Sequence, residues 1–463
     1  MIFSSLFFIF VFLPVSLAVY YLLPRKWRNL CLFAFSLVFY AWGEPVYVFL
    51  MLFTTAFDYT VGALLSRFEG RDTLRRAVLA FGICVNLAML AYFKYAALFI
   101  STINSVFSTA LPVPSAALPI GISFYTFESI SYAVDVYRGQ APAQRSLINF
   151  GTYVSFFPHL ISGPIIQYRE LQAQLQGRTE SMEHVTEGAM RFLHGLFKKV
   201  LLANNLALIA DKVQYCGNPT ALSAWLGALA FTFQIYFDFS GYTDMAIGLG
   251  RMFGFVLPEN FNMPYSSQSA ADFWRRWHMT LGRWFRDYLY IPLGGNRCKT
   301  IKFVRNLAIV WVLTGFWHGS SWNFAVWGAY WGFLIICEKL FLQKWLDRIP
   351  AFFRWLYAFL AAVVGWVFFS YMDIRQAGGM VAAMFGFSGG ADALGVYTLI
   401  TGAPVLLLAV LFCTPYPGRL LQWLDRKGKT GLVIRCAGMT VLFLLSVAAL
   451  VDNSYNPFLY FRF

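Results

Sequence analysis

Charged residues are scarce in this chain of 463 residues. Lys, Arg, Asp and Glu together make up 13% of it, about half of the roughly 25% that is typical of soluble domains. Hydrophobic residues make up 59%. One globular core could not hide so much apolar surface from water, whereas a lipid bilayer acts as a solvent for it. The composition therefore predicts an integral membrane protein and excludes an ordinary soluble domain.

The chain also lacks several signatures of catalysis and cofactor binding. It contains no Walker A sequence and no GxGxxG, so a nucleotide-binding fold is not indicated. No two of its five histidines stand at i, i+4, and no acidic residue completes a ligand set, so no metal site is predicted. The seven cysteines form no CxxC pair, which favours buried thiols over a disulfide framework.

The net charge of +14 could indicate nucleic-acid binding, but its distribution argues against that partner. Lys and Arg cluster between apolar runs, in segments 66–76, 297–305 and 417–430. Cytoplasmic loops of membrane proteins carry this excess. We therefore expect these segments in the cytoplasm and loops 101–117 and 372–396 on the opposite side, with the lipid bilayer and no nucleic acid as a partner.

Long apolar runs predict the fold class. A spanning helix needs about 20 apolar residues. The runs of suitable length are 2–23, 47–65, 77–100, 118–134, 147–166, 221–237, 355–371, 397–413 and 432–451. Shorter runs, such as 29–42, suggest re-entrant or broken helices. We expect an all-α polytopic protein with about ten or eleven transmembrane helices, and a single domain over residues 1–463. Segment 169–199 is expected to be a cytoplasmic or interfacial helix.

A polar stretch around His318 interrupts apolar sequence. It reads Gly-Phe-Trp-His-Gly-Ser-Ser-Trp-Asn, between the runs 307–313 and 324–336. Gly and Ser allow close backbone approach, so we expect a helix, a break and a second helix. At depth, a neutral imidazole can take a proton from a hydroxyl nucleophile and return it. A histidine satisfied by a polar neighbour is the structural alternative. Trp317 and Asn323 are candidates for binding substrate or donor.

A short stretch that begins at Asp272 is rich in charge. On a helix Asp272 and Arg276 are i, i+4 neighbours and can pair, and Arg283 and Asp287 repeat that spacing. One interpretation is an interfacial amphipathic helix with snorkelling arginines. The other is a binding wall on which Arg275, Arg276 and Arg283 face the phosphate or carboxylate oxygens of a donor.

The same charged stretch contains a second histidine of interest. His278 precedes His318 by 40 residues (318 − 278) in a chain that has only five histidines. The two imidazoles could therefore serve one catalytic site.

Two carboxylates follow an apolar run directly. Asp238 and Asp244 come at the end of run 221–237, where an unpaired charge at depth costs several kcal/mol. We expect the arginines of the charged stretch to be their partners. Structural pairing and a direct part in binding substrate or donor both remain open for these two residues.

Six runs, spread over nearly the whole chain, resemble the motifs of one known family. They are 121–127, 157–165, 233–244, 272–278, 315–319 and 456–463. They are similar to motifs of the membrane-bound O-acyltransferase (MBOAT) family, and within it to the branch of bacterial alginate O-acetyltransferases. By position, His318 matches the essential histidine of the family, and His278 matches a second histidine that members often place nearby.

The resemblance implies a fold and an activity. The family fold is a ring of tilted helices around a funnel with a central cavity. The implied reaction is O-acetyl transfer in the bacterial inner membrane, with cytoplasmic acetyl-CoA as the donor substrate and no bound cofactor. The implied acceptor is an exported polysaccharide, alginate or another exopolysaccharide, or a periplasmic partner protein that relays acetyl to it.

Two other functions remain open at this point. A related enzyme could take D-alanyl groups from a carrier-protein thioester and pass them to a cell-wall polymer. Alternatively, buried ionisable groups such as His318 are typical of proton-coupled transporters, although the sequence shows no inverted repeat.

Overall fold

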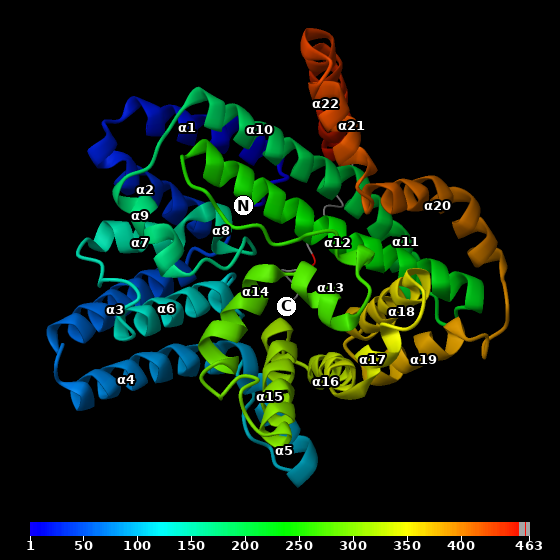
Figure 1. Cartoon of the computed structure of the whole chain (residues 1–463), viewed down its shortest axis with the longest axis horizontal. Helices are drawn as coiled ribbons and strands as arrows, with labels where there is room; N and C mark the ends of the chain where they lie inside the picture. The colour runs from blue at the N-terminus through cyan, green and yellow to red at the C-terminus, as the bar shows by residue number, and fades with distance from the viewer. Residues whose placement is uncertain (453–458, 460–463) are drawn as a thin grey trace. The chain divides into compact units, whose positions relative to one another are not determined.

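The computed structural model describes residues 1–452 and Leu459 (Figure 1). Every regular element among these residues is a helix, which confirms the all-α prediction. The motif expected at 456–463 lies outside the described residues, except for Leu459. The described chain folds into two compact units. The expectation of a single domain over residues 1–463 stays a prediction.

Unit 1 comprises Met1–Phe192, Met245–Pro258 and Arg283–Leu289. Its α-helices are α1 (Leu13–Leu22), α2 (Arg28–Ala41), α3 (Tyr47–Arg67), α4 (Asp72–Leu90), α5 (Ala96–Phe107), α6 (Ile122–Tyr137), α7 (Leu147–Ser155), α8 (Phe157–Leu160) and α9 (Tyr168–Gln176).

Unit 2 comprises Leu193–Asp244, Glu259–Gly282 and Tyr290–Phe463. Its α-helices are α11 (Asn204–Gln214), α13 (Ala270–Arg276), α15 (Thr300–His318), α16 (Trp322–Cys337), α17 (Gln343–Leu346), α18 (Ala351–Ser370), α19 (Ile374–Met384), α20 (Ala393–Phe412), α21 (Tyr416–Asp425) and α22 (Gly428–Asp452). Three further helices have residues in both units, namely α10 (Met182–Phe197), α12 (Ala221–Met252) and α14 (Met279–Phe285).

Short π-helical or 3-10 segments adjoin several of these helices. They are η1 (Phe8–Phe12), η2 (Arg25–Trp27), η3 (Ala91–Tyr95), η4 (Lys198–Ala203), η5 (Pro264–Ser266), η6 (Arg286–Tyr290) and η7 (Glu338–Leu342).

Seven helices in the described part of the chain are long and apolar enough to cross a membrane. They are Tyr47–Arg67, Asp72–Phe107, Met182–Gln214, Trp322–Leu346, Ala351–Ser370, Ala393–Phe412 and Gly428–Asp452. The polytopic prediction is therefore confirmed. Fewer helices meet the length criterion than the ten or eleven expected passes, because several apolar runs form shorter helices, such as Phe8–Leu22.

One of the expected spans is wrong, and one expected surface segment is part of a longer helix. Residues 147–166 form no continuous span, because α7 ends at Ser155 and α8 has only four residues. The charged segment 169–199 was expected to be cytoplasmic or interfacial. Its second half lies within Met182–Gln214, a helix of 33 residues that could span by its length and composition, so the location of the segment stays a prediction.

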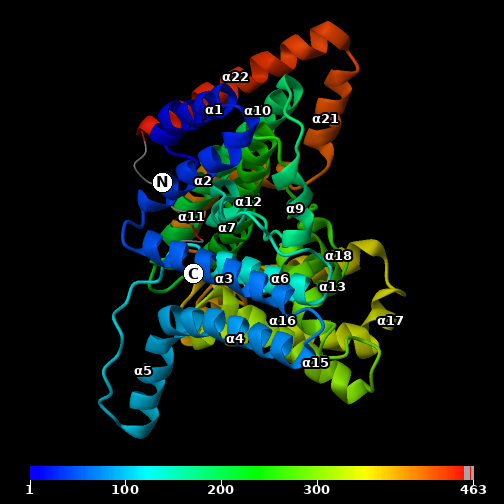
Figure 2. The same ribbon diagram turned by 90° about the vertical axis from the view of Figure 1, so that its left-hand side faces the viewer.

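Unit 1 is organised around three neighbouring helices. Helices α3, α4 and α6 lie side by side (Figures 1 and 2). A Cβ on Gly62 of α3 would collide with the ring of Tyr132 on α6, so glycine sets the close approach of these two helices. Between α3 and α4, Asn86 donates a hydrogen bond to Asp58 at 2.7 Å, and both side chains are buried. A polar pair thus joins helices that are otherwise apolar.

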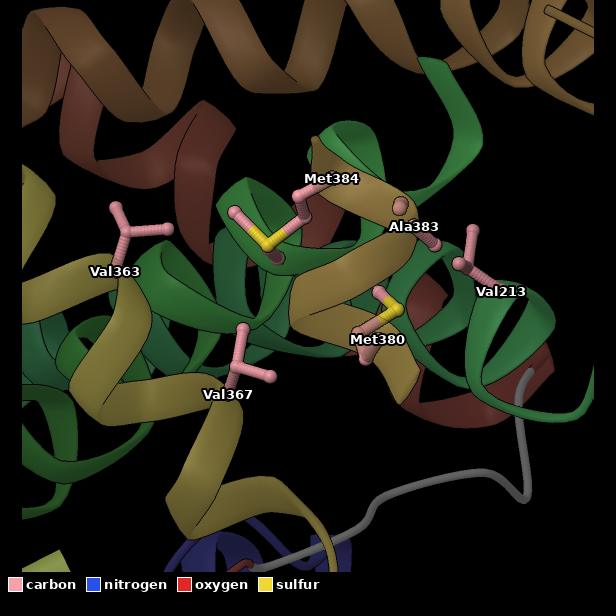
Figure 3. Packing of buried hydrophobic residues seen from close by; sticks show 8 residues of the cluster. Val213, Val363, Val367, Met380, Ala383 and Met384 are labelled. Atoms are coloured by element: carbon pink, nitrogen blue, oxygen red, sulfur yellow. The ribbon is translucent and has the colours of Figure 1, made fainter. Parts of the chain in front are cut away.

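Unit 2 contains a core of small and flexible apolar residues. Val363 and Val367 of α18 face Met380 and Met384 of α19, and Val213 of α11 lies close by (Figure 3). Asp373 caps the start of α19 by accepting the N–H of Arg375, so this helix begins where its cap stands. Helices α21 and α22 form a hairpin, and α22 also contacts η4 (Figure 2).

Candidate active site

A helical hairpin in unit 2 carries His318. Helix α15 ends at His318, a short extended break follows, and α16 starts at Trp322. The predicted order of helix, break and helix is confirmed. Both arms are longer than expected: α15 has 19 residues, and the second arm continues to Leu346 as a helix of 25 residues. His318 therefore lies at the turn between two long helices, where the backbone hydrogen bonds of α15 end.

Glycines hold the two arms of this hairpin together. A Cβ on Gly315 would collide with the carbonyl oxygen of Phe324, and a Cβ on Gly328 would collide with that of Trp311. Backbone contacts this close require glycine. The position of His318 at the end of α15 is consequently fixed by the packing of α16.

Aromatic rings surround the His318 imidazole. Its ring centroid lies 5.0 Å from that of Trp317, 5.0 Å from that of Trp327 and 5.4 Å from that of Phe369 on α18. The residue is only 2% exposed. His318 is thus largely shielded from water by aromatic side chains.

The second histidine lies beside the first. The ring centroids of His278 and His318 are 6.4 Å apart, as the sequence hypothesis of one shared site requires. His278 is 1% exposed and stands in the turn between α13 and α14 with φ of +45°, a left-handed conformation that non-glycine residues rarely adopt. Burial lowers the pKa of His278 to about 3, so its ring is neutral at pH 7.

Asn260 contacts His278 directly. Its side-chain oxygen lies 3.1 Å from His278 Nδ1, and it also accepts hydrogen bonds from the backbone N–H and the hydroxyl of Thr280. The backbone carbonyl of Asn260 accepts a hydrogen bond from the backbone N–H of Met279 at 3.0 Å. Sequence analysis missed Asn260, because an asparagine between two prolines is first of all typical of a turn.

Buried tryptophans extend the aromatic surroundings of the two imidazoles. Trp277 and Trp366 have ring centroids 4.6 Å apart, and Trp327 stacks on Trp366 at 6.1 Å. All three are fully buried. Some of the many aromatic residues of the chain thus lie in the protein interior and not at the membrane interfaces.

The two predicted site aspartates have lysine partners. Asp238 lies 2.6 Å from Lys199, and Asp244 lies 2.5 Å from Lys198. The expectation that arginines of the charged stretch would pair with them is wrong. Asp238 also accepts the N–H of Leu459 at 2.9 Å, so this carboxylate ties the end of the chain to α12.

The predicted arginines are engaged in separate ion pairs. Arg275 and Arg276 both contact Asp272, at 3.1 and 3.2 Å, which confirms the i, i+4 pair. Their side chains are 69% and 34% exposed. Arg283 belongs to unit 1 and pairs with Glu170 at 2.6 Å, so its expected pairing with Asp287 is wrong.

Asp287 has other partners in unit 1, Arg286 at 2.8 Å and Arg169 at 2.9 Å. Both arginines lie within reach because residue 287 is in the π-helical segment η6, which changes the facing of side chains relative to a regular helix.

The two other predicted residues, Trp317 and Asn323, have different positions: Trp317 lies beside the histidines, and Asn323 connects the hairpin to α18. Trp317 contacts both imidazoles, with its ring centroid 5.7 Å from that of His278. Asn323 donates from its amide nitrogen to the carbonyls of Phe368 and Tyr371 at the end of α18. That contact holds α16 against α18 and uses up the donors of Asn323.

A buried glutamate that the sequence did not point to supports the His278 turn. Glu338, in η7, accepts the N–H groups of Ala270 and Ala271 at 2.6 and 2.9 Å. These are the first residues of α13, whose N-terminal donors need partners. Tyr357 donates to the same carboxylate at 3.1 Å. Glu338 thus fixes the start of the helix that leads to His278.

The described residues contain no group of three or more His, Cys, Asp or Glu side chains that could hold a metal ion. They do contain a pair of neighbouring, buried imidazoles, and an imidazole can take up and return a proton.

Seven helices in the described chain that could span a membrane, together with a buried pair of neighbouring imidazoles, define a class, an integral membrane protein with a candidate acid–base centre. The chain belongs to the membrane-bound O-acyltransferase family, whose model matches residues 91–375. All nine predicted site residues, from Asp238 to Asn323, fall inside the matched segment. The chain is therefore an acyltransferase.

Curated relatives agree with this family. The chain is 42% identical to the probable alginate O-acetylase AlgI of Pseudomonas putida, over 100% of both chains. It is 31% identical to the peptidoglycan O-acetyltransferase of Helicobacter pylori, over 100% of this chain and 98% of the relative. It is also 30% identical to the teichoic acid D-alanyltransferase of Bacillus subtilis, over 51% of this chain and 62% of the relative.

Proposed function

We propose that the chain is an O-acetyltransferase of the bacterial inner membrane that moves acetyl groups from cytoplasmic acetyl-CoA to an exported polysaccharide, or to a periplasmic protein that relays acetyl to it. The names of the two relatives matched over their full length or nearly so describe acetyl transfer to a polysaccharide, alginate in one and peptidoglycan in the other. The acceptor in this proposal is alginate or another exopolysaccharide.

One observation carries the catalytic part of the proposal: two buried imidazoles with centroids 6.4 Å apart. A neutral His318 accepts the proton of the acceptor hydroxyl while the hydroxyl oxygen attacks the thioester carbonyl carbon. The new C–O bond forms, the C–S bond breaks, and the thiolate that leaves takes the proton. His278 contributes a second neutral ring, which can accept a hydrogen bond in the same place.

The structure changes what we propose for the other predicted residues. Asp238 and Asp244 hold Lys199 and Lys198, so we assign them to the packing of α12 and not to the chemistry. Arg275 remains the best candidate for a phosphate of the donor, because it is the most exposed of the predicted arginines and guanidinium groups bind phosphate well.

Substitution of the two central histidines in the producing bacterium tests the proposal. We expect His318→Ala to abolish acetylation of the exported polymer while the protein still accumulates in the membrane. His184→Ala is the matched control, because that ring only contacts the Thr179 carbonyl on the half-exposed start of α10. Normal polymer acetylation in a well-expressed His318→Ala strain would refute the proposal.

A second experiment concerns the donor. The teichoic acid D-alanyltransferase that matches half of this chain favours the alternative of D-alanyl transfer from a carrier-protein thioester. Purified protein in nanodiscs should bind acetyl-CoA in isothermal titration calorimetry. Transfer of D-alanine from a loaded carrier protein, with no binding of acetyl-CoA, would favour the alternative. Family membership makes the chain an acyltransferase, so the transporter hypothesis is not needed.

A further inference from the structure

The hydrogen bonds at Asn260 determine more than the position of His278. A side-chain amide has a carbonyl end that accepts and an NH₂ end that donates, and the two ends are told apart by their partners. The backbone N–H of Thr280 lies 3.1 Å from one end of the Asn260 amide. Because a backbone N–H can only donate, that end must be the oxygen.

The same oxygen decides the state of the imidazole. His278 Nδ1 lies 3.1 Å from Asn260 Oδ1. Two acceptors cannot share a hydrogen bond, so Nδ1 must carry the proton. In a neutral ring the other nitrogen, Nε2, then has none. Nε2 has no hydrogen-bond partner among the residues that the structure describes, and the rings nearest to His278 are those of Phe239, Trp317 and His318.

Asn260 is built to keep this arrangement. It is fully buried, so water does not compete for its oxygen. It binds the main chain of the turn at two further points, the N–H groups of Met279 and Thr280. The turn has His278 in a left-handed conformation, which is strained for a non-glycine residue and persists only where the surroundings impose it.

We propose that Asn260 is a positioning residue that holds His278 as the tautomer with the proton on Nδ1, so that Nε2 is the acceptor at the two-histidine centre. This inference rests on the proposed function for its catalytic meaning. Asn260 contacts His278 and acts through it, as a hydrogen-bond partner on one ring nitrogen fixes the tautomer and orientation of a metal-bound or catalytic histidine.

The direct test is the tautomer itself, which can be read without any activity. We would label the full-length protein with ¹⁵N-histidine in lipid bilayers and record solid-state NMR spectra. With only five histidines in the chain, the variant His278→Gln identifies the signals of His278. We expect a protonated Nδ1 and an unprotonated Nε2. A protonated Nε2 in the wild-type protein would overturn the inference.

Three variants separate positioning from mere support. Asn260→Ala removes the acceptor, and we expect mixed tautomers of His278 and a kcat that falls about 10- to 100-fold with little change in KM. Asn260→Asp keeps an acceptor in place, so the Nδ1–H tautomer and most of the activity should return. Thr280→Val removes the hydroxyl donor to Asn260 but keeps the Asn260 oxygen beside His278, so it should leave the tautomer unchanged.

The outcomes distinguish this inference from the proposed function. An unchanged tautomer in Asn260→Ala, or no recovery of the tautomer in Asn260→Asp, contradicts the positioning role whatever the enzyme transfers. The expected tautomers, combined with full activity of His278→Gln, would keep the structural inference but remove His278 from the proposed mechanism.

Discussion

At the scale of single residues, burial alone does not mark a catalytic histidine. His159 is as deeply buried as His318, yet its Nδ1 lies 3.0 Å from the carboxylate of Glu128. A buried histidine can thus have a carboxylate partner and a structural role. Sequence could not predict this partner, because Glu128 and His159 lie on different helices, α6 and α8.

The partners of the site aspartates show the same limit of sequence reasoning. The nearest charged stretch suggested arginines, whereas the lysines that pair with Asp238 and Asp244 lie about forty residues earlier, in η4. Local spacing predicts pairs along one helix, such as Asp272 with Arg276. It does not predict pairs between helices, which tertiary packing determines.

A first prediction concerns the buried pair of Lys199 and Asp238, both about 2% exposed. Lys199→Met leaves an uncompensated carboxylate in the interior, and we expect a loss of about 3–5 kcal/mol in stability. Thermal unfolding in detergent should show a clearly lower Tm. Adding Asp238→Asn should recover part of the loss. An exposed control, Arg275→Ala, should change stability by less than about 1 kcal/mol. Equal Tm values for Lys199→Met and Arg275→Ala would contradict this account.

At the scale of helices, the sequence placed the His318 break correctly and misjudged the arms. Gly315 and the small residues after His318 indicated a close approach of two helices, which the structure has. The arms were expected to be short because the apolar runs 307–313 and 324–336 are short. The helices extend beyond those runs, and polar Asn306, which precedes the first run, is fully buried inside the protein.

A second prediction tests the packing of this hairpin. Gly328→Leu forces a side chain against the Trp311 carbonyl, so the arms of the hairpin must separate and His318 must move. Overpacking of this kind costs about 1–3 kcal/mol, and we expect a lower Tm together with lower transferase activity. Gly378 in α19 has open space around it, so Gly378→Ala should be neutral or slightly stabilising. Wild-type stability of Gly328→Leu would show that the arms are not in tight contact.

At the scale of the whole molecule, composition predicted the class of protein and the class of fold. The 59% hydrophobic content is matched by seven helices in the described chain that could span. One of these, Met182–Gln214, was not expected, because charges dominate its first half and apolar residues its second. The mean hydropathy of a charged segment does not show whether the segment is a polar loop or the charged end of a longer apolar helix.

A third prediction concerns orientation in the membrane. The segment Asp72–Phe107 could span, and it separates the basic loop around Gly70 from the uncharged loop around Ser108. By the positive-inside rule, a cysteine at Gly70 should be labelled from the cytoplasm and one at Ser108 from the periplasm. Both positions are exposed. The background must lack the seven native cysteines, of which Cys84 and Cys436 are exposed. Labelling of both sites from one side would contradict the topology.

The most direct test of the central claim uses purified protein in proteoliposomes, with ¹⁴C-acetyl-CoA outside and a polysaccharide acceptor inside. If the two buried imidazoles perform acyl transfer, label should appear on the polymer with the wild-type protein and with His184→Ala. His318→Ala should reduce the rate to background although acetyl-CoA still binds. Transfer of label by His318→Ala at the wild-type rate would contradict the account.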